Sequence, residues 1–233
     1  MKSKKIKKID DPMSGGFYSA AEAGRLLEIK NAGKISHWLT EHPKDMAPLV
    51  NRQYKVIDGQ QTVGFFDLME IRSINYFRKK GVSLKNLRKV AINLRNELKV
   101  DHPFSTNTKL VTDRRDVFIH SAEESGDNIL LNLVTKQHTF YEVWEQFLEL
   151  GITFNMETGL PKNWVPVPRD FPDVMVDPRF AYGHPTISEN HVPTSALFKL
   201  WQAEKNLKIV GDWFGIEKSL AKQAVQFETR LAA

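Results

Sequence analysis

The sequence predicts an α+β protein that is mainly α-helical, with a winged helix-turn-helix in its N-terminal half. Two capping boxes, in which a side chain bonds to the backbone of a helix start, open helices there: Ser19 with Glu22, and Asp67 with Glu70. Between them the turn dipeptide 58–59 (Asp-Gly) separates two extended segments, a pattern typical of a hairpin. Three stripes of apolar residues at helical spacing close the chain and predict a compact trihelical unit.

The composition of the 233 residues bounds the class of protein. Hydrophobic residues make up 41%, enough for one large domain or two small ones. No apolar run approaches the ~18 residues that a membrane span needs, and no apolar segment follows the basic start as in a secretory signal. The absence of cysteine excludes disulfides and thiolate zinc sites and fits a reducing compartment. We therefore expect a cytoplasmic protein without membrane contact.

Charge divides the chain sharply. Residues 1–115 hold 23 basic and 12 acidic side chains, whereas residues 116–233 hold 10 basic and 16 acidic ones. The first part would be attracted to a polyanion and the second repelled by it, so the two parts are expected to face different partners.

Four units follow from these patterns. Their predicted bounds are a flexible basic arm over 1–16, the winged helix-turn-helix over 17–103, a middle α+β segment with a proline-rich connector over 104–172, and the trihelical, helix-turn-helix-like domain over 173–233.

Within the second unit, the capping box at Ser19 starts a helix, and a second helix is expected over 34–41 with Ile35, Trp38 and Leu39 inward. The hairpin that follows has the position of a wing. Asp67 is expected to cap the next helix, and Gly81 and Ser83 to end that helix and begin another.

The middle segment predicts short strands at 117–119 and 129–131, with the turn 126–128 between them, and one helix over 140–150. The connector is expected over 161–172. In the tail, Pro193-Thr194 opens the first of three helices, 209–214 belongs to the second, and Leu220 to Leu231 forms the third.

Duplex DNA is the partner that the first part predicts. In a helix-turn-helix the second helix enters the major groove, a wing straddles phosphates, and cations on the next helix clamp the backbone. The ten candidate residues are Asn31, Lys34, Ser36 and His37 at the second helix, Arg52 and Lys55 in the wing, and Arg72, Arg78, Lys79 and Lys80 on or just after the following helix.

Catalytic and metal chemistry are not expected. His184 and His191 lie near Asp177 in sequence, but lack the helical i, i+4 spacing that metal sites favour. A carboxylate cluster at 113, 116, 123, 124 and 127 could hold Mg²⁺ for phosphodiester cleavage, although its setting of strand ends and a turn favours solvated acids. No glycine-rich phosphate loop or nucleophile elbow is present, so we predict no enzyme, cofactor or metal.

At this point the residues resemble known families. Over residues 17–99, the segments 17–23, 67–72 and 81–84 (FYSAAEA, DLMEIR and GVSL), with Trp38, resemble the DNA-binding domain of MerR-type winged-helix regulators, although the long dimerising coiled coil is absent. The tail segments GHPTI and DWFGI resemble a small helical domain of bacterial antitoxins.

In this order the two parts are similar to VapB-like antitoxins that accompany PIN-type ribonuclease toxins. The resemblance implies a protein that neutralises a cognate toxin and represses its own operon, as a homodimer on an inverted repeat or a hetero-oligomer with the toxin. Two alternatives stay open: a free-standing MerR-like transcriptional regulator, and a protein-interaction module that has lost DNA binding.

Overall fold

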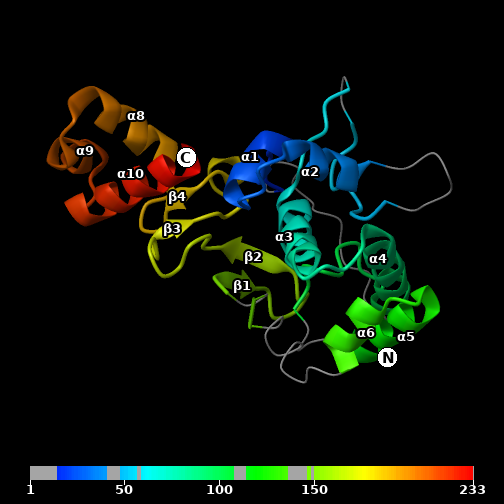
Figure 1. Ribbon diagram of the computed structural model, residues 1–233. Coiled ribbons are helices and arrows are strands. Elements are labelled where there is room, and N and C mark those ends of the chain that lie inside the picture. The colour runs from blue at the N-terminus through cyan, green and yellow to red at the C-terminus, as the bar shows by residue number, and fades with distance from the viewer. Residues whose placement is uncertain are drawn as a thin grey trace.

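The computed structural model describes residues 15–40, 48–56, 59–107, 114–135, 146–147 and 150–232. It is mainly helical with short antiparallel strands, which confirms the predicted α+β, mainly α class. Figure 1 shows α8, α9 and α10 gathered at one side, α1 to α6 at the other, and the strands between them. Within the described ranges, none of the helices is both long and apolar enough to cross a bilayer.

Helices α1 (Ala20–Leu26) and α2 (Ala32–Leu39) form the first helical pair. The Ser19–Glu22 capping box is present and starts α1, as predicted. In the turn, Ile29 N–H donates to the Gly24 carbonyl at 2.8 Å. A Cβ on Gly24 would lie 3.0 Å from the Ile29 oxygen, so the turn closes tightly on that glycine.

The structure describes the segment between α2 and α3 only in part. Gln60, just after the predicted turn, takes part in an isolated β-bridge, and Val63 pairs antiparallel with Tyr18, through N–O distances of 2.8 and 3.0 Å. Residues 57–58, at the predicted turn, lie outside the described residues. The described parts of this segment extend beside α2 (Figure 1).

Helix α3 (Phe65–Lys79) begins three residues earlier than predicted, and Asp67 is not its N-cap. Gly64 holds that position, and the Asp67 carboxylate accepts from the Gly64 N–H at 2.8 Å from the third residue of the helix. The predicted second capping box is therefore wrong. After α3, Gly81 adopts φ +92° and the Ser83 side chain caps α4 (Leu84–Leu98), both as predicted.

The two strands predicted in the middle segment are helices, α5 (Arg114–Ser125) and α6 (Asn128–Thr135). Gly126 at φ +65° ends α5, and the Asp127 carboxylate accepts from the N–H groups of Ile129 and Leu130 at 3.0 and 3.1 Å. The turn 126–128 thus stops one helix and caps the next. Of the predicted helix 140–150, all but 146, 147 and 150 lie outside the described residues.

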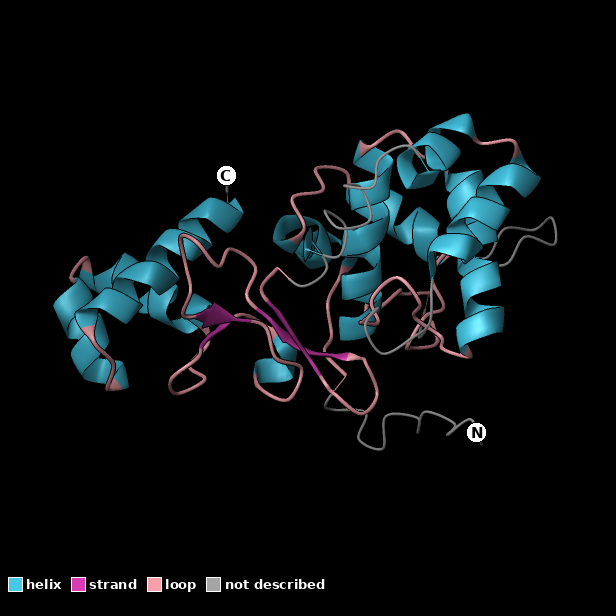
Figure 2. Ribbon diagram, turned by 90° about the horizontal axis from the view of Figure 1, so that it is seen from below, coloured by secondary structure: helices cyan, strands magenta, loops and turns pink. Residues whose placement is uncertain are grey.

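Two antiparallel strand pairs follow: β1 (Ile152–Phe154) with β2 (Pro161–Trp164), and β3 (Val174–Met175) with β4 (Thr186–Ile187). A bridge between Trp164 and Val176, with N–O distances of 2.8 and 2.7 Å, joins the pairs. The stretch predicted as a proline-rich connector therefore contains β2. Figure 2 shows the strands lying between the C-terminal helices and the rest of the molecule.

The tail forms three helices, as predicted: α8 (Thr194–Glu204), α9 (Leu207–Phe214) and α10 (Lys218–Ala232). Their shared core is Leu197, Val210, Ala224 and Phe227, all buried. Trp213 instead points outward, with 75% of its surface exposed.

The tail contacts the N-terminal part through the 3₁₀ turn Ala181–Gly183. Phe17 N–H donates to the Tyr182 carbonyl at 2.9 Å, and the Tyr18 hydroxyl donates to the Gly183 carbonyl at 2.7 Å. Gly183 has φ +84°, and a Cβ there would lie 2.4 Å from the Tyr18 oxygen. The approach therefore requires glycine.

Candidate nucleic-acid interface

Helix α2 presents two of the predicted DNA-binding side chains to solvent. Lys34 and His37 are exposed, while Ile35, Trp38 and Leu39 are buried as predicted. Two other residues differ in character: Asn31 is exposed but its carboxamide oxygen caps α2 by accepting from the Gly33 N–H at 2.9 Å, and Ser36 is half-buried.

The residues of the predicted wing lie at the same end of the molecule as α2. Val50 N–H donates to the Trp38 carbonyl at 3.4 Å, and the Gln61 amide donates to the Thr40 hydroxyl at 2.9 Å, which fixes both sides of the segment to the end of α2. On this segment Arg52 is half-buried and Lys55 is exposed. The structure thus brings Lys34, His37, Arg52 and Lys55 to one end of the molecule.

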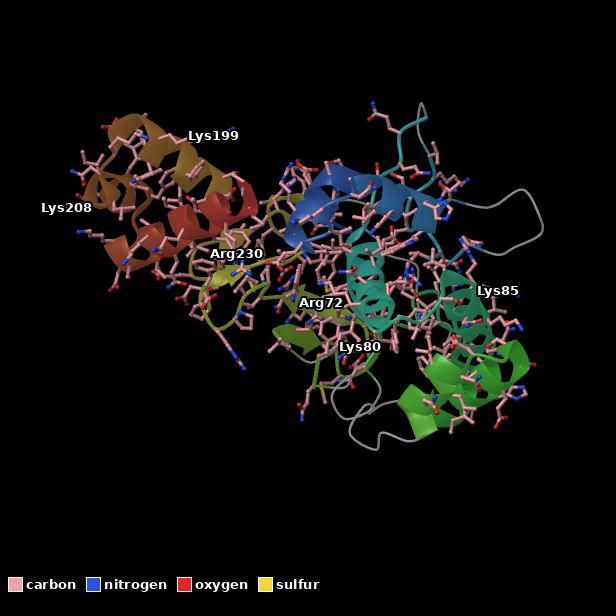
Figure 3. All side chains as sticks on the ribbon, viewed as in Figure 1. Arg72, Lys80, Lys85, Lys199, Lys208 and Arg230 are labelled. Carbon is pink, nitrogen blue, oxygen red and sulfur yellow. The ribbon has the colours of Figure 1, made fainter. Side chains whose placement is uncertain are left out.

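The basic run 78–80 lies elsewhere. It follows the last turns of α3, whose 15 residues give a length of roughly 20 Å at a rise of 1.5 Å per residue. Figure 3 shows Lys80 at the end of α3 that is remote from α2. All three side chains are exposed, with the Arg78 guanidinium donating to the Val82 carbonyl and the Lys80 ammonium 5.7 Å from the Tyr76 ring centroid. These cations form a separate group.

Arg72 was predicted to clamp phosphates, but the structure places it in the interior. It is 8% exposed, donates to the carbonyls of Phe147 and Leu150 at 2.7 and 3.2 Å, and stacks over the Phe147 ring at 4.0 Å. Burial lowers the pKa of this guanidinium to about 9. Through these contacts, and with its guanidinium 5.7 Å from the Trp164 ring in β2, Arg72 joins α3 to the strand region.

Sequence reasoning missed a buried polar network beneath the predicted wing. The Gln53 N–H donates to both Asp67 oxygens at 3.2 Å, and the Arg95 guanidinium donates to the carbonyls of Pro48 and Leu49 at 3.2 and 2.6 Å. These bonds hold the backbone on either side of Arg52. The network therefore holds the start of the predicted wing in place.

Two carboxylates and one imidazole form the centre of that network. Asp67 and Glu70 are fully buried, and the His102 Nδ1 lies 3.1 Å from Glu70 and 3.7 Å from Asp67. Burial raises the pKa of Asp67 to about 6. Burial would lower the pKa of His102, but its hydrogen bond to Glu70 and the charges of Glu70 and Asp67 raise it overall. The signal that could have revealed this was a helix with apolar residues on every side, which leaves its acids no solvent-facing position.

The groups considered for metal chemistry have other contacts. The Asp177 carboxylate accepts from the Arg179 guanidinium at 2.9 Å, and the His191 ring stacks on Phe180 with centroids 3.5 Å apart. Glu123 and Glu124 are exposed, Asp127 caps α6, and the side chains of 113 and 116 lie outside what is described. No three or more His, Asp or Glu side chains are grouped to hold a metal in the part of the chain that the structure describes.

The fold is that of a mainly helical protein in which two helical pairs with tight turns flank a small strand region. No family model matches the chain. The chain is 24% identical over 226 residues to a Mycobacterium tuberculosis protein named "Putative antitoxin VapB45", covering 90% of this chain and 92% of that protein. Its fold resembles the crystal structure of Rv2018 from the same organism, with a TM-score of 0.70, 23% identity, and coverage of 94% of this chain and 100% of the other.

Proposed function

We propose that this protein is an antitoxin, which neutralises a PIN-type ribonuclease toxin and represses its own operon by binding duplex DNA. The observation that carries the proposal is similarity to a protein named as an antitoxin along nearly the whole length of both chains. The similarity therefore extends over nearly the whole chain and is not limited to one shared motif.

The DNA half of the proposal is supported by the end of the molecule that carries α2. Lys34 and His37 on α2 and Lys55 on the segment that follows it are exposed cations or hydrogen-bond donors. Side chains of this kind contact phosphates and base edges when a helix enters the major groove. A homodimer would place two copies of α2 on an inverted repeat, with half-sites about 34 Å or a multiple of it apart.

The toxin half of the proposal can be tested by expressing the neighbouring gene with and without this chain. If a small nuclease with an acidic active site is encoded there, its expression alone should arrest growth and co-expression of this chain should restore it. A matched control co-expresses a His102→Ala variant, whose buried acids lose their partner and whose folding is expected to fail. Continued arrest with the wild-type chain, present as a folded protein, would overturn the antitoxin proposal.

A further inference from the structure

The tail repeats the turn that joins α1 to α2. In α9, the Gly211 carbonyl accepts from the N–H of Ile216, five residues on, at 3.0 Å; Gly24 and Ile29 make the same contact at 2.8 Å. A Cβ on Gly211 would lie 2.7 Å from the Ile216 oxygen, as one on Gly24 would lie 3.0 Å from that of Ile29. Between glycine and isoleucine each turn has a left-handed residue, Gly215 at φ +65° and a glutamate at φ +54°.

The packing around this second turn fixes which face of α10 is inward. Ile216, Ala221 and Ala224 are buried, and the two alanines let α10 lie close against α8 and α9. Small residues at these positions allow helix axes to approach. Helix α10 also contacts α1, β3 and β4, and Arg230 near its end pairs with Glu28 and Asp170. The arrangement is that of a helix-turn-helix, with α10 in the position of the helix that would enter a groove.

The outward face of α10 is polar and cationic. Lys218, Lys222 and Gln226 are exposed at i, i+4 spacing along one row. Ser219 is exposed beside them and donates to the Glu217 carboxylate at 3.1 Å. The single acid within α10, Glu228, instead accepts from the Thr194 hydroxyl, at the α8 side.

The charge of the tail is opposite to that of the segment before it. Residues 194–232 hold six basic and four acidic side chains, whereas residues 116–193 hold four basic and twelve acidic ones. The acidic excess of the second part of the chain therefore lies outside the trihelical unit. Lys205 and Lys208 are also exposed, at the start of α9, where the Asn206 carboxamide oxygen accepts from the N–H groups of Lys208 and Ile209 (Figure 3 labels Lys208).

We propose that α9 and α10 form a second duplex-DNA-binding element, in which Lys218 and Lys222 contact phosphates and Gln226 reads a base edge. A glutamine carboxamide can pair with the N6 and N7 of adenine, whereas lysines bind phosphates as point charges. The inference rests on the DNA half of the proposed function and adds a second contact surface to it. Under this proposal each chain binds DNA at two places.

The test uses the full-length chain and a duplex carrying its own upstream region, with an unrelated duplex of equal length for comparison. Affinity is measured over a series of salt concentrations for five proteins: the wild type, Gln226→Ala, Lys218→Ala/Lys222→Ala, Lys34→Ala/His37→Ala, and Lys85→Ala/Lys199→Ala. The last is matched in charge to the α10 pair, with Lys85 on α4 and Lys199 on α8, so neither residue belongs to α10 (Figure 3).

We expect the α10 pair to weaken binding to both duplexes by about tenfold. It should also lower the slope of log affinity against log salt by about 2, because each of the two lysines neutralises one phosphate. Gln226→Ala should reduce only the preference for the upstream duplex. The Lys85/Lys199 control should bind like the wild type.

Three results would overturn the inference, and they separate it from the proposed function. If the Lys218→Ala/Lys222→Ala variant keeps the wild-type affinity and salt slope while the Lys34→Ala/His37→Ala variant binds more weakly, only the proposed second DNA-binding element is wrong. If the Lys218→Ala/Lys222→Ala variant binds DNA normally but no longer suppresses the toxin, this face of α10 contacts a protein partner instead of DNA. A wild-type chain that binds neither duplex removes the DNA half of the proposed function as well.

Discussion

The two helical pairs share a turn but differ in what surrounds it. In α1–α2 the turn is followed by the predicted wing segment, and Gln53 of that segment bonds to Asp67 of the buried Asp67–Glu70–His102 network. In α9–α10 the pair is covered by α8, and the outer face of α9 exposes Ile209 and Trp213, 41% and 75% accessible. The comparison shows the same glycine-to-isoleucine backbone contact in two helical pairs that have different neighbouring elements and expose different side chains.

The largest effect is expected from Arg72, which was predicted for the DNA face of the first pair and lies inside. Arg72→Ala should lower the free energy of unfolding by about 4 kcal/mol, because it leaves two carbonyls without their donor and removes buried packing. Urea denaturation measures this, with Lys80→Ala as a control that should change stability by less than about 0.5 kcal/mol. A stable Arg72→Ala protein with weakened DNA binding would return this residue to the interface.

The network that only the first pair possesses should make stability depend on pH. The pKa of Asp67 is raised to about 6 from 3.8, so the folded protein holds this proton more tightly than the unfolded chain does. Stability from this group is therefore present below pH 4 and lost as pH rises to 6, by about 3 kcal/mol. The raised pKa of His102 acts in the same direction at higher pH.

Asp67→Asn removes the first of these titrations. The free energy of unfolding of the wild type minus that of the variant should fall between pH 4 and pH 6, as measured by denaturant titration at each pH. A difference that stays level or rises over this range would contradict the raised pKa of Asp67 in the network.

The two turns themselves can be compared by adding one methyl group to each. Gly211→Ala should destabilise the protein by about 2 kcal/mol, because a backbone oxygen 2.7 Å away must move, and Gly24→Ala by about 1 kcal/mol, since the corresponding distance is 3.0 Å. Thermal or urea unfolding provides the ranking. If neither substitution changed the free energy of unfolding, the two turns would not be as tightly closed as described.

The junction between the two parts should show the smallest effect. Tyr18→Phe removes the hydrogen bond to the Gly183 carbonyl, at an expected cost of about 1 kcal/mol. Burial also raises the pKa of the Tyr18 hydroxyl, so its ultraviolet titration should occur above the ordinary range of tyrosine. Equal stability for Tyr18→Phe and the wild type would mean that this bond contributes nothing to the docking of the tail.

Local signals predicted the parts of the fold that local contacts determine. The capping box at Ser19, the cap at Ser83, the stop at Gly81 and the three tail helices each depend on residues within one or two turns. The strands expected at 117–119 and 129–131 failed because packing of Val117, Phe118 and Leu130 against neighbouring helices overrides their β-propensity.

The candidate site was predictable only in part, for the same reason. The exposure of Lys34 and His37 follows from the apolar stripe of α2, which the sequence displays. The burial of Arg72 and of the Asp67–Glu70 pair depends on the strand region and on His102, which lie more than 30 residues away. No short window of sequence contains both partners of these contacts.

The most direct test of the two-pair account is photo-crosslinking of the full-length chain to its upstream duplex. A photoreactive amino acid is placed in turn at Lys34, Lys222, Lys85 and Lys199, all exposed. The account predicts crosslinks from positions 34 and 222, at separate sites on the duplex, and none from 85 and 199. Crosslinks from 85 or 199, with positions 34 and 222 silent, would contradict it.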